Sequence, residues 1–261
     1  MENMHEFKKF IESTNVAIER AIQLKDEALG TTEKIVYDQQ LLQLFKTADK
    51  TFKLCEKLKS GINAWLNPNQ VERLQAKLAQ QFLNATTSRL TSSGQLANDE
   101  LAIAQELCED SGLAFVLLTY SAALKEIGRS EKSFISEVQN GILTTLNTFI
   151  KKQWPEIQKE RRILEEMRLD YASLRRKLEH AADEKMKESL GEKCEAARHA
   201  FESQLCSTKL VLEQISTVQI QALLSQSLKK LAADQVKHHE HCLEVLHNLT
   251  EALGPIKTPD V

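Results

Sequence analysis

A seven-residue repeat of apolar side chains is the feature that most restricts how this chain can fold. Its members are Leu143, Ile150, Ile157, Leu164, Tyr171 and Leu178. Leu146, Met167 and Leu174 fill the position three residues later, although Gln153 and Glu160 interrupt this second row. Such a repeat forms a seam along one helix, which packs on a neighbouring helix in a left-handed coiled coil.

The composition extends this helical prediction to the whole chain. Only 8 glycines and 4 prolines occur in 261 residues, and aromatic residues make up 5%, so long uninterrupted helices are favoured. We expect helices over about 17–66, 98–182 and 194–253, with a bend at Trp154-Pro155. They predict an all-α fold, a long three-helix antiparallel coiled-coil bundle. Because three amphipathic helices leave apolar surface uncovered, we also expect a homodimer.

The segments outside the bundle divide the chain further. Residues 1–16 form an amphipathic N-terminal segment, residues 17–253 form the bundle, and residues 254–261 form a C-terminal tail or the start of a linker. Within the bundle, residues 67–94 form an insert, because the sequence "NPNQ" at its beginning ends the first helix.

The N-terminal segment carries apolar residues at helical spacing beside two lysines. Phe7, Phe10 and Ile11 would enter the acyl boundary of a membrane, while Lys8 and Lys9 would reach the headgroups. The alternative is an extension that packs on the bundle or stays disordered.

The insert presents the same choice. Its apolar residues Val71, Leu74, Leu78 and Phe82 share one helical face and either cover the core or enter a membrane. Two cations lie beside them, Arg73 and Lys77.

The basic residues of the third quarter of the chain follow the seam. Arg161, Arg168 and Arg175 come four residues after seam positions, where coiled coils commonly place interhelical salt bridges, so salt bridges are favoured over lipid contact. Arg162 and Arg176 should point further outward and are better candidates for anionic lipid. Further candidates are Lys177, Lys185, Lys187 and Lys193.

Several classes of chemistry find no support in the sequence. Motifs for phosphate-binding loops, dinucleotide binding, zinc proteases and serine hydrolases are absent, so no enzyme and no cofactor are expected. His238, His241 and Cys242 share a helical face, but a fourth metal ligand is not evident, so a solvated polar patch is favoured over a metal site. The net charge of −3 does not favour nucleic acid, and five scattered cysteines predict a reduced cytoplasmic protein.

Several longer strings resemble the endophilins, an N-BAR family, and most of all its B branch. They are "ERAIQLKDEALG" at 19–30, "LNPNQVER" at 66–73, "EIGRSEKSF" at 126–134, "ILTTLNTFI" at 142–150 and "KERRILEEMRLDY" at 159–171. The resemblance implies a crescent-shaped antiparallel homodimer that binds anionic membranes and bends them into tubules. It also implies that the N-terminal segment and the insert contact lipid.

These observations predict a peripheral membrane protein that senses or generates curvature in trafficking or organelle remodelling. Family members usually carry a Src-homology-3 domain after the bundle, and this chain ends at Val261 without one, so no protein partners are carried over. The alternative is a coiled-coil scaffold that binds proteins and no lipid. In that case, removing residues 1–16 would leave lipid binding unchanged.

Overall fold

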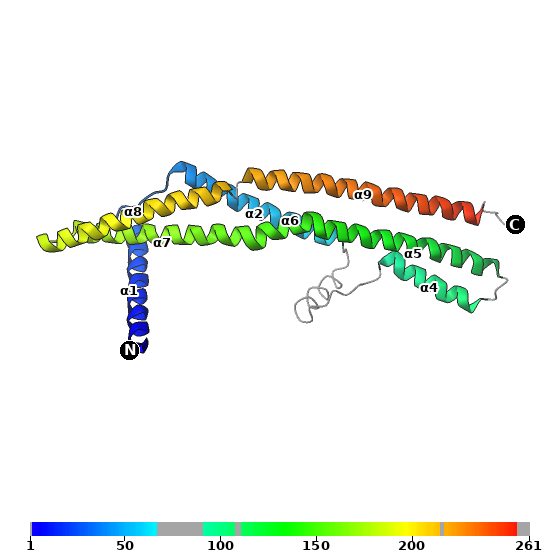
Figure 1. Cartoon of the computed structure of the whole chain (residues 1–261), viewed down its shortest axis with the longest axis horizontal. Helices are drawn as coiled ribbons and strands as arrows, with labels where there is room; N and C mark the ends of the chain where they lie inside the picture. Colours follow the sequence, from blue (N-terminus) through cyan, green and yellow to red (C-terminus); the bar gives the residue numbers. More distant parts are fainter. Residues whose placement is uncertain (1, 67–90, 108–110, 215–216, 255–261) are drawn as a thin grey trace. The chain divides into compact units, whose positions relative to one another are not determined.

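A computed structural model describes residues 2–66, 91–107, 111–214 and 217–254, with side chains from residue 14 onward except at residues 217 and 218. The described residues form helices and short connections, with no β-strand among them (Figure 1). The predicted all-α fold is therefore confirmed. None of the described helices combines the length and the apolar character needed to cross a bilayer.

Two compact units make up the chain, and each has its own packing. The first contains Met1–Cys55 and Thr148–Ile220, and the second contains Glu56–Asn147 and Gln221–Val261. The seam of the seven-residue repeat is confirmed in both, because Leu143, Ile157 and Leu164 are buried while Tyr171 and Leu178 are half-buried.

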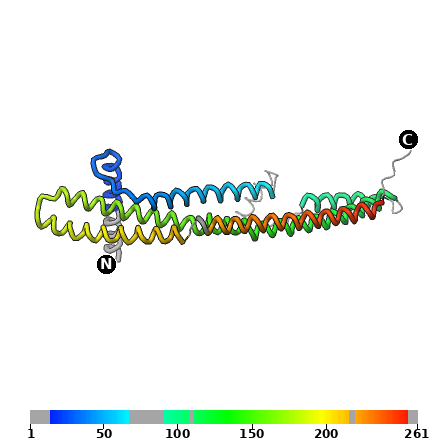
Figure 2. Tube along the Cα trace, turned by 90° about the horizontal axis from the view of Figure 1, so that it is seen from above, coloured from blue at the N-terminus to red at the C-terminus, as the bar shows by residue number. Residues whose placement is uncertain are grey.

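In the first unit, helices α7 (Trp154–Glu179) and α8 (Glu184–Gln214) lie side by side as an antiparallel pair (Figure 2). The third predicted helix begins earlier than the expected residue 194, because α8 starts at Glu184. The amino-terminal part of α2 (Gln39–Leu66) joins them, and α1 (Glu2–Ala28) runs across α7 rather than along it (Figure 1). The core of this unit consists of Leu41, Phe45, Ala48, Ile157, Leu164, Phe201 and Leu212.

The predicted single helix over 17–66 is wrong, because the chain turns between α1 and α2. Gly30 adopts a φ of 71°, which glycine reaches without steric penalty. Its N–H donates to the carbonyl of Glu27 at 3.2 Å, and the N–H of Thr31 donates to the carbonyl of Asp26 at 3.0 Å. This pair of bonds caps the last turn of α1. Nor does a helix start at Ala17, since α1 continues from Glu2.

In the second unit, α4 (Ser92–Glu106) and α5 (Gly112–Val138) form an antiparallel pair packed through small residues. A Cβ atom added at Gly128 would lie 3.1 Å from the backbone nitrogen of Gly94 and 2.9 Å from Oγ1 of Thr91. The hydroxyl of Ser121 donates to the carbonyl of Ala97 at 2.7 Å. Close approach of the two backbones therefore defines this contact. Most of α9 (Thr217–Leu253) also belongs to this unit.

The predicted helix over 98–182 is interrupted and begins earlier than expected. Thr91 caps α4, because its Oγ1 accepts a hydrogen bond from the N–H of Gly94 at 3.2 Å. After α5, the chain passes through two π-helical turns, η1 (Gln139–Leu143) and η2 (Phe149–Gln153), with α6 (Thr144–Thr148) between them. Proline lacks an N–H but is tolerated in a first helical turn, so Pro155 lies at the start of α7 and the helix continues.

Candidate functional site

Helix α1 contacts the first unit through a row of polar side chains. From residue 14 onward, the α1 residues that are not exposed are Glu19, Arg20, Gln23, Asp26 and Glu27. Residues three or four apart share one face of a helix, so these five form a continuous strip, here called the polar strip. Since the usual inward face of a helix is apolar, this docking mode differs from that of an ordinary amphipathic helix.

The polar strip ends in a buried charge network around Arg168 of α7. The Arg168 side chain is 0% exposed, and that of Glu27 is 4% exposed. Two parallel hydrogen bonds of 2.9 Å run from Arg168 to the Glu27 carboxylate, and two more of 2.8 and 3.0 Å run to Glu165. Tyr37 also donates to Glu165 at 2.5 Å. Such bidentate pairs are geometrically specific, so this network fixes the carboxyl-terminal end of α1.

The network shifts the pKa values of its members. Burial alone would raise the pKa of Glu27, but hydrogen bonds from Arg168 and Gln23 outweigh it and lower that pKa. The pKa of Glu165 is lowered in the same way, by the hydrogen bonds from Arg168 and Tyr37 against the effect of burial. Burial raises the pKa of Tyr37, and the neighbouring Glu165 raises it further. Both carboxylates are therefore held ionised.

The other docking contacts of α1 are less buried ion pairs. Arg20 donates to Asp170 with two bonds of 2.7 Å. Arg176 pairs with Asp26, and Lys177 pairs with Glu19. The hydrogen bond from Lys177 lowers the pKa of Glu19.

All three regularly spaced arginines form salt bridges, as favoured from the sequence, but only Arg161 and Arg168 bind a residue of another helix. Arg161 donates to Asp49 of α2 at 2.6 Å and covers the Phe45 ring at 4.4 Å. Arg168 binds Glu27 of α1. Arg175 donates to Glu33, in the connection between α1 and α2, at 3.1 Å.

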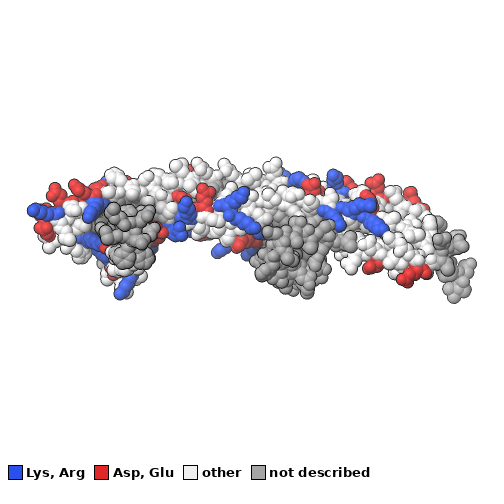
Figure 3. Space-filling view, turned by 60° about the horizontal axis from the view of Figure 1, so that its bottom comes forward, with Lys and Arg blue, Asp and Glu red and all other residues white. Residues whose placement is uncertain are grey.

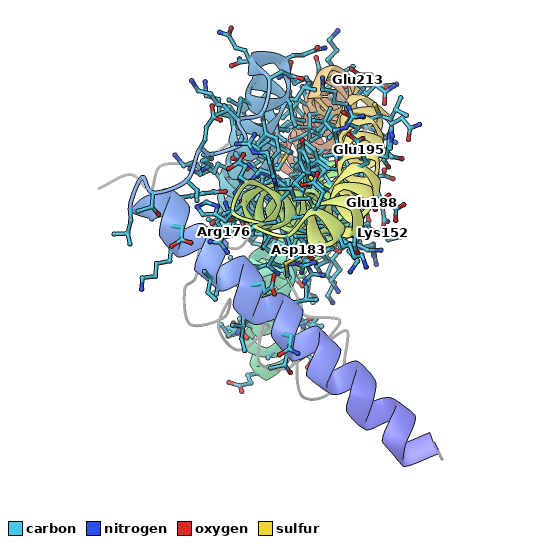
Figure 4. The ribbon with its side chains drawn as sticks, turned by 90° about the vertical axis from the view of Figure 1, so that its left-hand side faces the viewer. Lys152, Arg176, Asp183, Glu188, Glu195 and Glu213 are labelled. Atoms are coloured by element: carbon cyan, nitrogen blue, oxygen red, sulfur yellow. The ribbon has the colours of Figure 1, made fainter. Side chains whose placement is uncertain are left out.

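The expected outward position is correct for Arg162 and wrong for Arg176. The Arg162 side chain is 73% exposed, with a long contact of 3.7 Å to Glu166. The Arg176 side chain is only 20% exposed, because it reaches Asp26 across the helix interface. Figure 4 shows Arg176 on the side of α7 that faces α1. Since the two partners are 150 residues apart in sequence, local spacing could not reveal the pair.

The remaining predicted cations lie on α8 and are exposed. Lys185 and Lys193 have no ion-pair partner within the described part of the chain, and Lys187 contacts Glu184 at 3.6 Å. Lys151 and Lys152 in η2 are also exposed, and the sequence analysis did not select them. Figure 3 shows that basic side chains alternate with acidic ones instead of forming a continuous basic patch.

The structure describes none of the side chains of the predicted membrane-inserting residues. Phe7, Phe10 and Ile11, with Lys8 and Lys9, belong to α1, but their side chains are not described. The insert residues Val71, Arg73, Leu74, Lys77, Leu78 and Phe82 lie outside the described residues. The structure does describe Ile18 and Ile22 on α1, which are 52% and 44% exposed and continue the sequence spacing of Phe7 and Ile11.

The histidine cluster near the end of α9 packs on an aromatic ring. His238 stacks on Phe134 with ring centroids 5.2 Å apart, and its Nδ1 lies 2.8 Å from the Ser130 hydroxyl. Burial lowers the pKa of His238. The prediction of a solvated patch is therefore wrong for His238, which is half-buried. Across the described residues, no group of three or more potential ligands is placed to hold a metal ion.

Comparison with known proteins agrees with this helical arrangement. The sequence profile described as "BAR domain" matches residues 11–254. Endophilin-B2 of Rattus norvegicus is 25% identical over 280 residues, which cover 95% of this chain and 69% of that protein. Human Endophilin-B2 is 25% identical over 276 residues, with the same coverage. Endophilin-B1 of Rattus norvegicus is 25% identical over 247 residues, covering 95% of this chain and 67% of that protein.

Proposed function

We propose a function from the premise that this chain belongs to the BAR domain family, whose profile matches nearly its whole length. Membership places it among proteins that act on membrane curvature. We infer that this chain binds anionic membranes as a curved homodimer and senses or generates their curvature, as a peripheral protein on the cytoplasmic side.

The observation that carries this proposal is the orientation of α1. Its polar strip faces α7, while Ile18 and Ile22 are exposed to solvent. An isolated helix on a protein surface normally buries such residues. By spacing, Ile18 and Ile22 continue the row of Phe7 and Ile11. Exposed apolar side chains such as Ile18 and Ile22 are suited to the interface between headgroups and acyl chains.

The exposed cations would provide the electrostatic part of binding. Each basic residue near an anionic leaflet contributes about 1 kcal/mol. Arg162, Lys185, Lys187 and Lys193 are exposed, but acidic neighbours such as Glu184 offset part of their charge. We therefore expect binding to depend on both charge and insertion, with the N-terminal segment and the insert as inserting elements.

The second unit supports the proposed homodimer. It exposes large apolar side chains on α4, α5 and α9, which would be covered in an assembly. They include Leu96, Ile103, Leu113, Phe115, Leu118, Leu243 and Leu246. Sedimentation velocity of the purified chain tests this assembly, and a monomer at all concentrations would contradict it.

Co-sedimentation with phosphatidylserine-containing vesicles of two sizes tests membrane binding, with electron microscopy for tubules. The variant Ile18→Glu/Ile22→Glu should lose most binding, because it places charges in the apolar row. Leu210→Glu is a control for placing a charge on an exposed apolar residue outside α1, since Leu210 is exposed on α8, and it should bind as the unmodified chain does. Absence of binding by the unmodified chain would reject the proposal in favour of the protein-binding scaffold.

A further inference from the structure

Two of the cations selected as lipid contacts are occupied by carboxylates of the same chain. Arg176 is bound to Asp26 and Lys177 to Glu19, and both acids belong to the polar strip of α1. A carboxylate and a lipid phosphate offer the same kind of ligand, an anionic oxygen, to a guanidinium or an ammonium group. Arg176 and Lys177 therefore cannot bind a headgroup in full while α1 is docked.

We propose that Arg176 and Lys177 form an anion-binding site that α1 occupies in solution, and that an anionic membrane displaces Asp26 and Glu19 and releases α1 from α7. This inference rests on the proposed membrane function. It assigns α1 a second role, as an internal competitor for the cations.

The docking contacts of α1 differ in burial. The Glu27–Arg168 pair is buried, and headgroups cannot reach it. The pairs of Asp26 with Arg176 and of Glu19 with Lys177 keep all four side chains between 20% and 43% exposed. Exposed ion pairs are weak and sensitive to salt, whereas breaking a buried pair is strongly unfavourable. We therefore expect the exposed pairs to open while Glu27 stays bound to Arg168, so that α1 does not detach completely.

The competition is close to balanced, which allows a membrane to shift it. An exposed ion pair and a cation near an anionic leaflet contribute similar free energies. Membrane binding additionally buries apolar side chains of α1, including Ile18 and Ile22, which are exposed in the docked state. Release frees Arg176 and Lys177 for lipid, also opens the pairs of Arg20 with Asp170 and Glu166, and lets α1 reorient on the lipid surface.

The test compares variants that open the contact in different ways. Glu19→Gln/Asp26→Asn removes the internal carboxylates and leaves both cations free. It should bind phosphatidylserine-containing vesicles about thirtyfold more tightly than the unmodified chain, since two cations become available. Arg176→Gln/Lys177→Gln opens the same contact but removes the anion site, so binding should not tighten. Circular dichroism verifies that each variant is folded.

A charge-matched control separates release from a general gain of positive charge. Glu213→Gln/Glu244→Gln raises the net charge by the same amount at exposed positions on α8 and α9, away in the sequence from the proposed lipid-binding cations. Figure 4 shows Glu213 on the side of the first unit away from α1. This control should bind distinctly less tightly than Glu19→Gln/Asp26→Asn. Equal binding by the two variants would overturn the proposal.

Hydrogen exchange of residues 14–28 reports on α1 directly. Exchange should be faster in both variants that open the contact than in the unmodified chain without lipid. In the unmodified chain it should change on phosphatidylserine-containing vesicles and stay unchanged on phosphatidylcholine vesicles. Inorganic phosphate at the same phosphate concentration should leave it unchanged, because it lacks the charge density of a leaflet. Release by free phosphate would overturn the assignment to a membrane.

The outcomes also distinguish this inference from the proposed function. If the unmodified chain binds anionic vesicles but its α1 exchange does not change, only the inference is overturned. If neither the unmodified chain nor Glu19→Gln/Asp26→Asn binds them, both are overturned.

Discussion

Two helix contacts, one in each unit, bring backbones together by opposite means. In the first unit, α1 docks on α7 through the polar strip, which ends in the buried pair of Glu27 and Arg168. In the second unit, α4 docks on α5 through small residues such as Gly94, Ala97 and Gly128. The first contact depends on charge, so its strength should vary with salt and pH. The second depends on close packing.

This difference shows how one chain can combine a fixed element with a releasable one. Salt and external anions do not compete with packing between close backbones. They do compete with a row of partly exposed ion pairs. The difference can be tested separately at each contact, because each unit contains one tryptophan, Trp154 in the first and Trp65 in the second. Replacing one by phenylalanine leaves the other as a fluorescence reporter.

The largest effect is expected from Arg168→Met in the first unit. Glu27 would remain buried without its partner, so the free energy of unfolding should fall by about 3–5 kcal/mol. Urea denaturation followed by Trp154 fluorescence in a Trp65→Phe background measures it. Adding Glu27→Gln to this variant should recover much of the loss. A loss below about 1 kcal/mol would show that the pair behaves like an exposed one.

The corresponding test of shape is Gly128→Ala in the second unit. The new methyl group would press on the backbone of α4, so we expect a loss of about 1–3 kcal/mol. Gly61→Ala on α2 is the matched control, because a Cβ there meets no atom within 4 Å. It should stabilise the helix by about 0.5–1 kcal/mol. Trp65 fluorescence in a Trp154→Phe background reports both, and equal effects would contradict close packing at Gly128.

Acid should weaken the first unit more than the second. Glu19, Glu27 and Glu165 have pKa values below the ordinary 4.5, so the stability that they provide is complete above pH 4.5. It is lost as pH falls through their lowered folded-state values. In the second unit, the hydrogen bond from Arg129 lowers the pKa of Glu126 and burial lowers that of His238, so these two also cost stability in acid. Burial raises the pKa of Glu100, however, and its protonation in acid has the opposite effect. Urea midpoints at pH 7 and pH 3 should therefore fall further for Trp154 than for Trp65, and parallel falls would contradict this.

The smallest effect is expected at the exposed pair of Lys177 and Glu19. A double-mutant cycle with Lys177→Gln and Glu19→Gln should give a coupling free energy of about 0–1 kcal/mol. In 1 M salt, where the Debye length is about 3 Å, the coupling should largely vanish. Coupling that is large and independent of salt would show that α1 is permanently fixed.

The coiled-coil seam could be predicted from the sequence because a helical repeat is local information. Ile157 and Leu164 recur at seven residues, and both are buried as expected. Because the salt-bridge positions follow from the seam, Arg161, Arg168 and Arg175 could also be assigned. The acidic partners of these arginines, in contrast, depend on how distant segments meet.

The docking of α1 could not be predicted, because its inward face carries no apolar signal. Hydrophobic periodicity points to Ile18 and Ile22, which are exposed, and away from Gln23, which is buried. Periodicity also concealed the turn after α1, although Gly30 followed by two threonines was a visible break signal. The pair of Arg176 and Asp26 is a further consequence of this docking.

The polar strip also determines how α1 should respond to temperature. Opening this contact exposes charged and amide groups to water. Exposure of polar groups makes the heat-capacity change of opening smaller, whereas exposure of hydrocarbon makes it larger. The dehydration penalty of ion pairs decreases on warming, and apolar contacts weaken on cooling. Cooling should therefore loosen the contact of α4 with α5, which is made by small residues. Warming should favour the ion pairs of α1. The temperature of greatest stability should therefore differ between the two contacts.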